Sequence, residues 1–71
     1  MKSPIIKRSV VVNGHKTSIS LEDAFWIEVK AIASEKNTTV TELVTNIDRD
    51  RQASNLSSAL RVFVLRHLQA A

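Results

Sequence analysis

A chain of 71 residues forms one domain, and it buries only about 60% of the surface that its unfolded form exposes, so a single copy would be marginally stable. It contains no cysteine, which excludes disulfides and thiolate metal sites, and His15 and His67 lie near opposite ends without neighbouring ligands at metal spacing. Oligomerisation is the usual remaining way to supplement so small a core.

The net charge of +3 is unevenly distributed along the chain. Four basic residues precede the first acidic one, Glu22: Lys2, Lys7, Arg8 and Lys16. The next segment is acidic, and the C-terminal third is basic again through Arg51, Arg61 and Arg66. A basic arm on a balanced body favours a polyanionic partner, although a solvated tail fits the charge equally well. No apolar run approaches the roughly 18 residues of a membrane span, so we expect a cytoplasmic protein.

Residues 1–14 form a basic N-terminal segment that is either a loose arm or an outer strand. The stretch KRSVVVNGHKTSISL contains two extended runs around Asn13-Gly14, a pair suited to the positive φ angles of a type I′ turn. A hairpin is one interpretation, and pairing of the second run with another partner is the alternative. The second run alternates, with Thr17, Ile19 and Leu21 on one side and Lys16, Ser18 and Ser20 on the other.

Three helices are expected after this strand. Helical periodicity predicts the first over residues 22–35, ending near Asn37, which suits a left-handed C′ position. Thr39 and Glu42 form a capping box that opens the second. Asn55 caps the third, on which Val62 and Leu65 lie off the apolar stripe and therefore need cover from a partner.

The sequence offers little for catalysis, so we predict a protein that is not an enzyme and holds no cofactor or metal. Its serines have no histidine or acidic partner in a recognisable motif, and Gly14 is the only glycine, which excludes phosphate-cradling loops. The aromatic side chains lie on helices, which argues against a base-stacking sheet for RNA.

The polar strand face suggests double-stranded DNA instead. A two-stranded antiparallel ribbon fits the major groove, where lysine can bind guanine and serine can bind several base edges. An ordinary edge strand with its polar side outward is the alternative explanation.

The segment KTSISLEDAFWIEVKAIASEKNTTVTELV, one strand and two capped helices, resembles the Arc/MetJ-like ribbon-helix-helix family of DNA-binding proteins. The resemblance implies a mainly α fold with a short β-strand, in which two chains form an intertwined homodimer around an intermolecular two-stranded antiparallel ribbon. Residues 15–71 would form this domain, with a third helix added at its C-terminal end.

The resemblance also implies site residues. Lys16, Ser18 and Ser20 would contact DNA bases, and the N–H groups near Thr39 and Val40 would hold a phosphate, as a free helix N-terminus can. The preceding basic residues Lys7 and Arg8 are further candidates for phosphate contacts. NLSSALRVFVLRHL also resembles the family's second helix, and in that alternative the phosphate site moves to the region of Ser57.

The resulting hypothesis is a sequence-specific DNA-binding protein that acts as a transcriptional repressor. The alternative is a protein-interaction module or antitoxin whose C-terminal helix docks on a partner protein through Val62 and Leu65.

Overall fold

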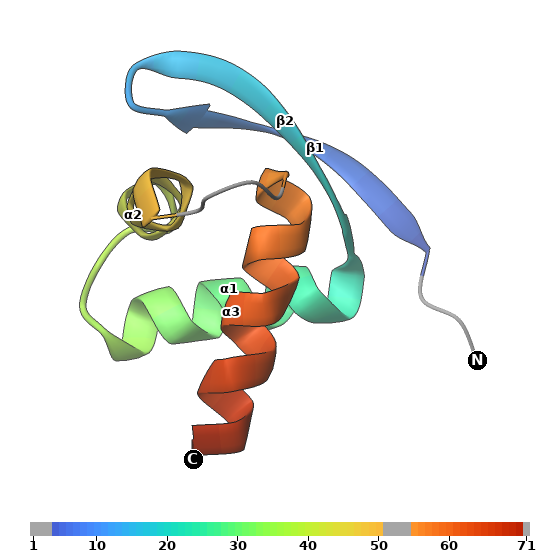
Figure 1. Ribbon diagram of the computed structural model, residues 1–71, viewed down its shortest axis with the longest axis vertical. Helices are drawn as coiled ribbons and strands as arrows, with labels where there is room; N and C mark the ends of the chain where they lie inside the picture. Colours follow the sequence, from blue (N-terminus) through green and yellow to red (C-terminus); the bar gives the residue numbers. More distant parts are fainter. Residues whose placement is uncertain (1–3, 51–54, 71) are drawn as a thin grey trace.

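The computed structural model describes residues 4–50 and 55–70. Two strands precede three helices: β1 (Ile5–Val12), β2 (His15–Glu22), α1 (Asp23–Glu35), α2 (Val40–Asp50) and α3 (Leu56–Ala70). The hairpin of β1 and β2 arches over the helices (Figure 1). This arrangement confirms the predicted ribbon-helix-helix order with an added third helix. The first three residues of the predicted arm, together with Arg51, lie outside the described residues.

The two strands pair with each other within one chain. Asn13 and Gly14 have φ angles of 52° and 81°, the left-handed values that a two-residue hairpin turn requires. From this turn the antiparallel register runs from Val12 opposite His15 to Ile5 opposite Glu22. Residues 7–12, whose structure the sequence left open, therefore belong to a strand, whereas pairing between two copies stays a prediction.

The hairpin has one face toward the helices and one away from them. Val12, Ile19 and Leu21 point inward and are buried in the core. The opposite side, called the outer face from here on, carries alternate residues of both strands: Ile5, Lys7, Ser9 and Val11 of β1, and Lys16, Ser18, Ser20 and Glu22 of β2. The alternation predicted for the second run is therefore confirmed.

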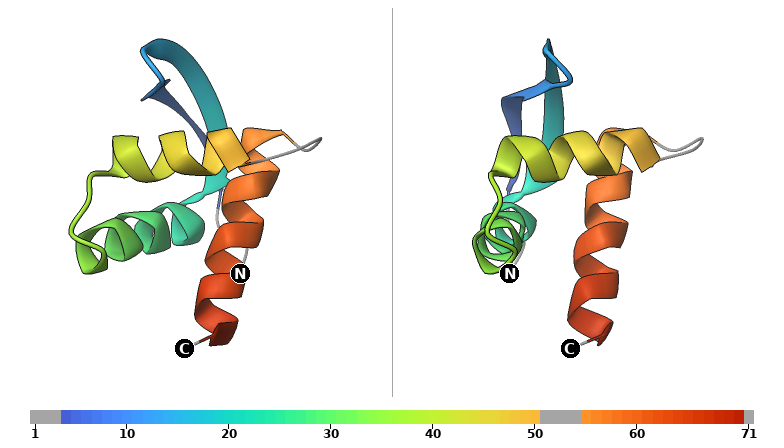
Figure 2. Two further views of the ribbon diagram at one scale, coloured as in Figure 1. Left: turned by 60° about the vertical axis from the view of Figure 1, so that its left-hand side comes forward. Right: turned by 90° about the vertical axis from the view of Figure 1, so that its left-hand side faces the viewer.

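The helices pack against both strands of the hairpin and complete the core. β1 contacts α2, whereas β2 contacts α1 and α3, and Figure 2 shows α3 descending from the hairpin past α1. Buried residues of the helices close this core: Val29, Ile32, Ala33, Leu43, Val44, Leu56, Leu60 and Val64. Because the hairpin covers the helices with its inner face, most of the outer face remains exposed, whereas Ser20 and Glu22 at one end are half-buried.

The end of α1 follows the predicted pattern. Asn37 has a left-handed φ of 58°. The Asn37 N–H donates to the Ser34 carbonyl at 3.1 Å, and the Thr38 N–H donates to the Ala33 carbonyl at 2.9 Å. These two bonds satisfy carbonyl groups that the helix end would otherwise leave open. The turn thereby sets the direction in which α2 begins.

Candidate nucleic-acid interface

The outer face brings together the three residues predicted to contact bases. Lys16 and Ser18 are exposed and Ser20 is half-buried. The register sets Val11 opposite Lys16, Ser9 opposite Ser18 and Lys7 opposite Ser20. Side chains directly opposite each other in such a pair lie about 4.5–5.5 Å apart at Cβ. The result is one continuous surface of short side chains with a lysine toward each end.

The helix α3 holds one end of this surface from the side. The Ser20 N–H donates to Ser57 Oγ at 2.9 Å, and Arg61 Nη2 donates to the Ser20 carbonyl at 3.1 Å. Backbone groups alternate between the two edges of an antiparallel strand, so those of Ser18 point to the same edge as those of Ser20. Part of the edge that a second strand would need is therefore occupied by α3.

Glu22 completes this contact between β2 and α3. Arg61 Nε donates to Glu22 Oε1 at 2.9 Å. A hydrogen bond from the backbone N–H of Glu22 and this bond from Arg61 together hold the pKa of the carboxyl below its ordinary value. The one acidic residue of the outer face thus remains ionised and is neutralised by its arginine partner.

Lys7 and Arg8, both predicted to contact phosphates, lie on opposite faces of β1. Lys7 is exposed on the outer face. Arg8 faces the helices, where Nη2 donates to Asp23 Oδ1 at 2.9 Å and the guanidinium carbon lies 4.8 Å from the centre of the Trp26 ring. Its Nε is buried without a hydrogen-bond partner. In this conformation Arg8 joins β1 to α1, and a phosphate contact would require the ion pair to open.

The N-terminus of α2 lies beside Thr39, as the capping box predicted. Thr39 Oγ1 accepts from the Glu42 N–H at 3.0 Å, and the Leu43 N–H makes the first bond along the helix, to the Thr39 carbonyl at 3.0 Å. The Glu42 carboxylate accepts a 2.6 Å bond from the Thr38 hydroxyl. The N–H groups of Val40 and the residue after it therefore precede the helical bonds and can donate to an anion.

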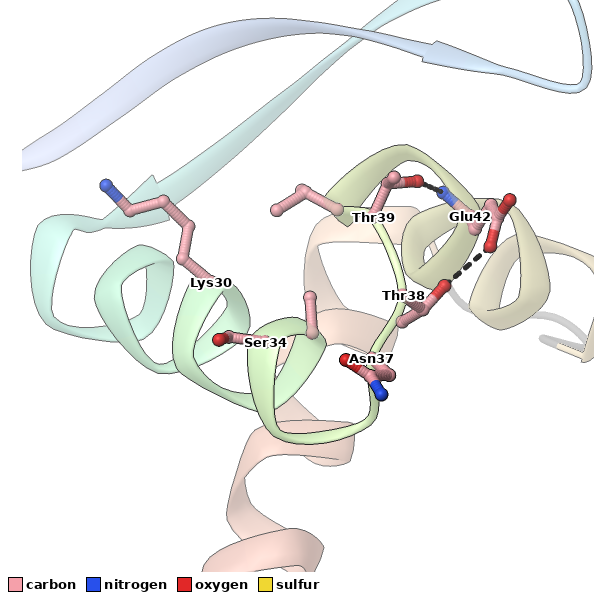
Figure 3. Close-up of a pocket in the computed structure, with 8 residues that line it drawn as sticks. Lys30, Ser34, Asn37, Thr38, Thr39 and Glu42 are labelled. Atoms are coloured by element: carbon pink, nitrogen blue, oxygen red, sulfur yellow. Dashed lines mark hydrogen bonds between the residues drawn. The ribbon is translucent and has the colours of Figure 1, made fainter.

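An open pocket of about 540 Å³ lies against this helix start. Figure 3 shows Lys30 on one side of it, and Thr39 and Glu42 on the other. Lys30 is exposed and supplies a cation that sequence reasoning missed. Its spacing offered only a partial signal: Lys30, Ser34 and Asn37 follow one face of α1 to the turn before α2, and all three line the pocket.

The start of α3 is different. Asn55 Oδ1 accepts from the Ser58 N–H at 2.8 Å, which confirms the predicted cap. Ser57, the alternative centre of the phosphate site, has its hydroxyl bonded to β2. The α3 N-terminus is therefore packed against the strand rather than open as the α2 N-terminus is.

Two other kinds of site are absent from the part of the chain that the structure describes. In it, no three His, Cys, Asp or Glu side chains gather closely enough to bind a metal ion. Within the same residues, no helix has the length and apolar character needed to cross a membrane.

Comparison with known proteins assigns a family. The solved structure of an uncharacterized protein from Bordetella pertussis Tohama I matches with a TM-score of 0.77 and 33% sequence identity over 97% of this chain. The match covers 61% of that protein, so this chain spans less than two thirds of its length. A search of curated proteins found no match. The family model for the ribbon-helix-helix domain matches residues 5–68, and the chain therefore belongs to this family of DNA-binding proteins, which generally bind as dimers.

Proposed function

We propose that this protein is a cytoplasmic bacterial transcriptional repressor that binds double-stranded DNA as a homodimer, with the outer face of the hairpin in the major groove. The outer face is the observation that carries the proposal. Its polar residues are serines, two lysines and a glutamate that Arg61 neutralises. Such a surface approaches a polyanion closely without a repelling charge.

The chemistry of Lys16, Ser18 and Ser20 fits base edges in the major groove. A lysine can donate to guanine O6 and N7, and a serine hydroxyl can donate or accept at several bases. Because these serines are short, the strand backbone can lie near the floor of the groove. Serine discriminates less between bases than arginine or asparagine does, so we expect modest specificity for each half-site.

Phosphate contacts would supply most of the affinity. Lys7 lies on the outer face, and Thr39 and Val40 line a pocket that Lys30 borders. These groups are the best placed to bind the phosphates of the DNA backbone. Arg8 would join them only after release from Asp23.

The dimer is proposed from the size of the core and from the family. An intermolecular ribbon along β2 would use the edge on which Ser57 and Arg61 now bind Ser20. This form of the dimer therefore requires α3 to release that edge. Sedimentation equilibrium on wild type and on Ser57→Ala would reveal whether the release strengthens association.

The test of DNA binding is a titration of labelled duplex, followed by fluorescence anisotropy at two salt concentrations. The duplexes are the protein's own upstream DNA and a scrambled copy. We expect wild type to prefer the upstream duplex with a steep salt dependence, and the triple variant Lys16→Ala/Ser18→Ala/Ser20→Ala to lose the preference while staying folded.

Arg66→Ala is the control for loss of a positive charge, because Arg66 is exposed on α3. It should weaken binding less than the triple variant and keep the preference. Equal binding of the upstream and scrambled duplexes by wild type would contradict the proposal.

A second candidate function is supported by exposed apolar side chains on α3. Val62 is 47% exposed, and Leu65 and Leu68 are each 52% exposed. An apolar row on a helix favours a protein partner, as in the antitoxin alternative. Val62→Glu and Leu65→Glu should then abolish partner binding and leave DNA binding intact, whereas Lys16→Glu should do the reverse.

A further inference from the structure

The turn of the hairpin contains the one asparagine of the chain that precedes a glycine, Asn13 before Gly14. Both residues are exposed, and both have left-handed φ angles. We propose that Asn13 deamidates spontaneously in the folded protein and that the carboxylate formed at the hairpin tip weakens DNA binding. The chemical step is independent of the proposed function, whereas its effect on DNA rests on that function.

The reaction needs only water. The backbone nitrogen of Gly14, after its proton passes to hydroxide, attacks Cγ of Asn13. The new C–N bond closes a cyclic imide as the bond from Cγ to Nδ2 breaks, and ammonia leaves with a proton taken from water. Water then opens the imide at either carbonyl and gives aspartate or isoaspartate. An amide is thus exchanged for a carboxylate, and nothing is oxidised or reduced.

The turn leaves the attacking nitrogen open. The last pair of the hairpin is Val12 with His15, so the Gly14 N–H lies outside the ladder of backbone hydrogen bonds. Gly14 also has no Cβ, and apart from its chain neighbours nothing lies within 4 Å of the position that a Cβ would take. The attack requires Asn13 to rotate, and an exposed turn at the end of a two-stranded hairpin opens at low cost.

The other asparagines are protected by hydrogen bonds. Asn37 precedes Thr38, whose N–H donates to a carbonyl of α1 at 2.9 Å. Asn46 lies within α2, where the next N–H belongs to the helical ladder. The Asn55 side-chain oxygen accepts from the Ser58 N–H at 2.8 Å, which fixes the amide as a cap. Asn13 therefore differs from the other three in structure as well as in the residue that follows it.

A carboxylate at the turn changes one end of the outer face. Lys16, which we propose to contact bases, lies opposite Val11 and one pair away from the turn. A new negative charge beside Lys16 opposes the approach of a polyanion. Isoaspartate also adds a carbon to the backbone of the turn, whose geometry sets the register of the hairpin. We therefore expect isoaspartate to weaken DNA binding more than aspartate does.

The first experiment follows the reaction in the full chain. Wild type is incubated at mildly alkaline pH, and peptide mapping by mass spectrometry measures the amide that remains at each asparagine. We expect Asn13 to react about tenfold faster than Asn37, Asn46 or Asn55, which corresponds to a barrier lower by about 1.4 kcal/mol.

Incubation in denaturant is the control, because it removes the protection that folding provides. It should accelerate the reaction at Asn37, Asn46 and Asn55 more than at Asn13. If folding slows the reaction at Asn13 as strongly as at the other three, the inference is wrong.

The second experiment measures the effect on DNA. After incubation, wild type should bind the upstream duplex about two- to threefold more weakly than fresh protein, as one added surface charge predicts. Asn13→Gly is the control, because it keeps a residue suited to positive φ but has no amide, and incubation should leave its affinity unchanged. Fresh Asn13→Asp keeps the turn and adds only the charge, so it should reproduce the loss caused by aspartate. If incubated wild type keeps full affinity after Asn13 has been converted, the effect on DNA is wrong.

Failure of this inference is distinguishable from failure of the proposed function. If fresh wild type prefers no duplex over a scrambled one, the proposed function is wrong, and the peptide map alone decides whether Asn13 deamidates. If fresh wild type prefers the upstream duplex but Asn13 keeps its amide as long as the other asparagines do, only the deamidation is wrong.

Discussion

The N-termini of α2 and α3 carry the same kind of cap but lie in different surroundings. Thr39 caps α2 through the Glu42 N–H at 3.0 Å, and Asn55 caps α3 through the Ser58 N–H at 2.8 Å. The start of α2 opens into a pocket bordered by Lys30. At the start of α3, by contrast, the Ser57 hydroxyl accepts a hydrogen bond from the Ser20 N–H of β2. A cap shows where a helix begins, but the tertiary packing decides whether that end can bind an anion.

The largest effect is expected from truncation of the Leu60 side chain, which is fully buried and anchors α3 in the core. Leu60→Ala should lower the free energy of unfolding by about 2–5 kcal/mol, because the change leaves a cavity between α3 and its neighbours. Chemical denaturation measures it. The same change at the half-exposed Leu65 should lower stability by less than about 1 kcal/mol. Similar losses in both variants would mean that α3 is not anchored through Leu60.

A smaller effect is expected at the contact between α3 and β2. Ser57→Ala removes the acceptor of the Ser20 N–H and should lower the free energy of unfolding by about 1–2 kcal/mol, because a part-buried donor loses its partner. Ser58→Ala is the control, since Ser58 is also half-buried and contributes its backbone N–H to the cap. Equal losses in the two variants would contradict a specific role for Ser57.

At the start of α2 the expected effect is on binding. Glu42→Gln removes a negative charge from the pocket and keeps an oxygen for the Thr38 hydroxyl, so affinity for duplex should rise about two- to threefold. Anisotropy titration at low salt measures the change. Asp50→Asn makes the same change in charge at the opposite end of α2. An equal rise in that variant would assign the effect to net charge rather than to the helix start.

The smallest effect concerns pH. The pKa of the Glu22 carboxyl is lower in the folded chain than in the unfolded chain, so the unfolded chain binds more protons as the pH falls. The ionised Glu22 therefore stabilises the fold above the ordinary carboxyl pKa of about 4.3, and this stabilisation is lost on acidification. The denaturation midpoints of wild type and Glu22→Gln should therefore converge on acidification. In an Arg61→Met background the convergence should shrink. An unchanged convergence there would exclude Arg61 as a cause.

Local patterns were sufficient to predict several features. The Asn13-Gly14 turn, the alternation of β2, the left-handed Asn37 and the caps at Thr39 and Asn55 all depend on neighbours in sequence. Each is set by backbone geometry or by hydrogen bonds within a few residues, which a single sequence displays.

Features that depend on tertiary packing were harder to predict from the sequence. Lys7 and Arg8 were grouped by charge, yet consecutive residues of a strand face opposite sides, so only one can lie on the outer face. Lys30 was missed because its relation to α2 depends on the turn between the helices. The hydrogen bonds from Ser20 to Ser57 and Arg61 join segments far apart in the chain, so no local sequence pattern predicts them.

The pairing of β1 with β2 across a two-residue turn also bears on how the chain folds. Hairpins close within about 1–10 μs, and contacts between residues near in sequence favour fast folding. A surface built on this hairpin forms by a unimolecular step whose rate does not depend on protein concentration. The pairing of β1 with β2 therefore does not itself require an encounter between two chains, whereas the stability of the complete core can still depend on a second copy.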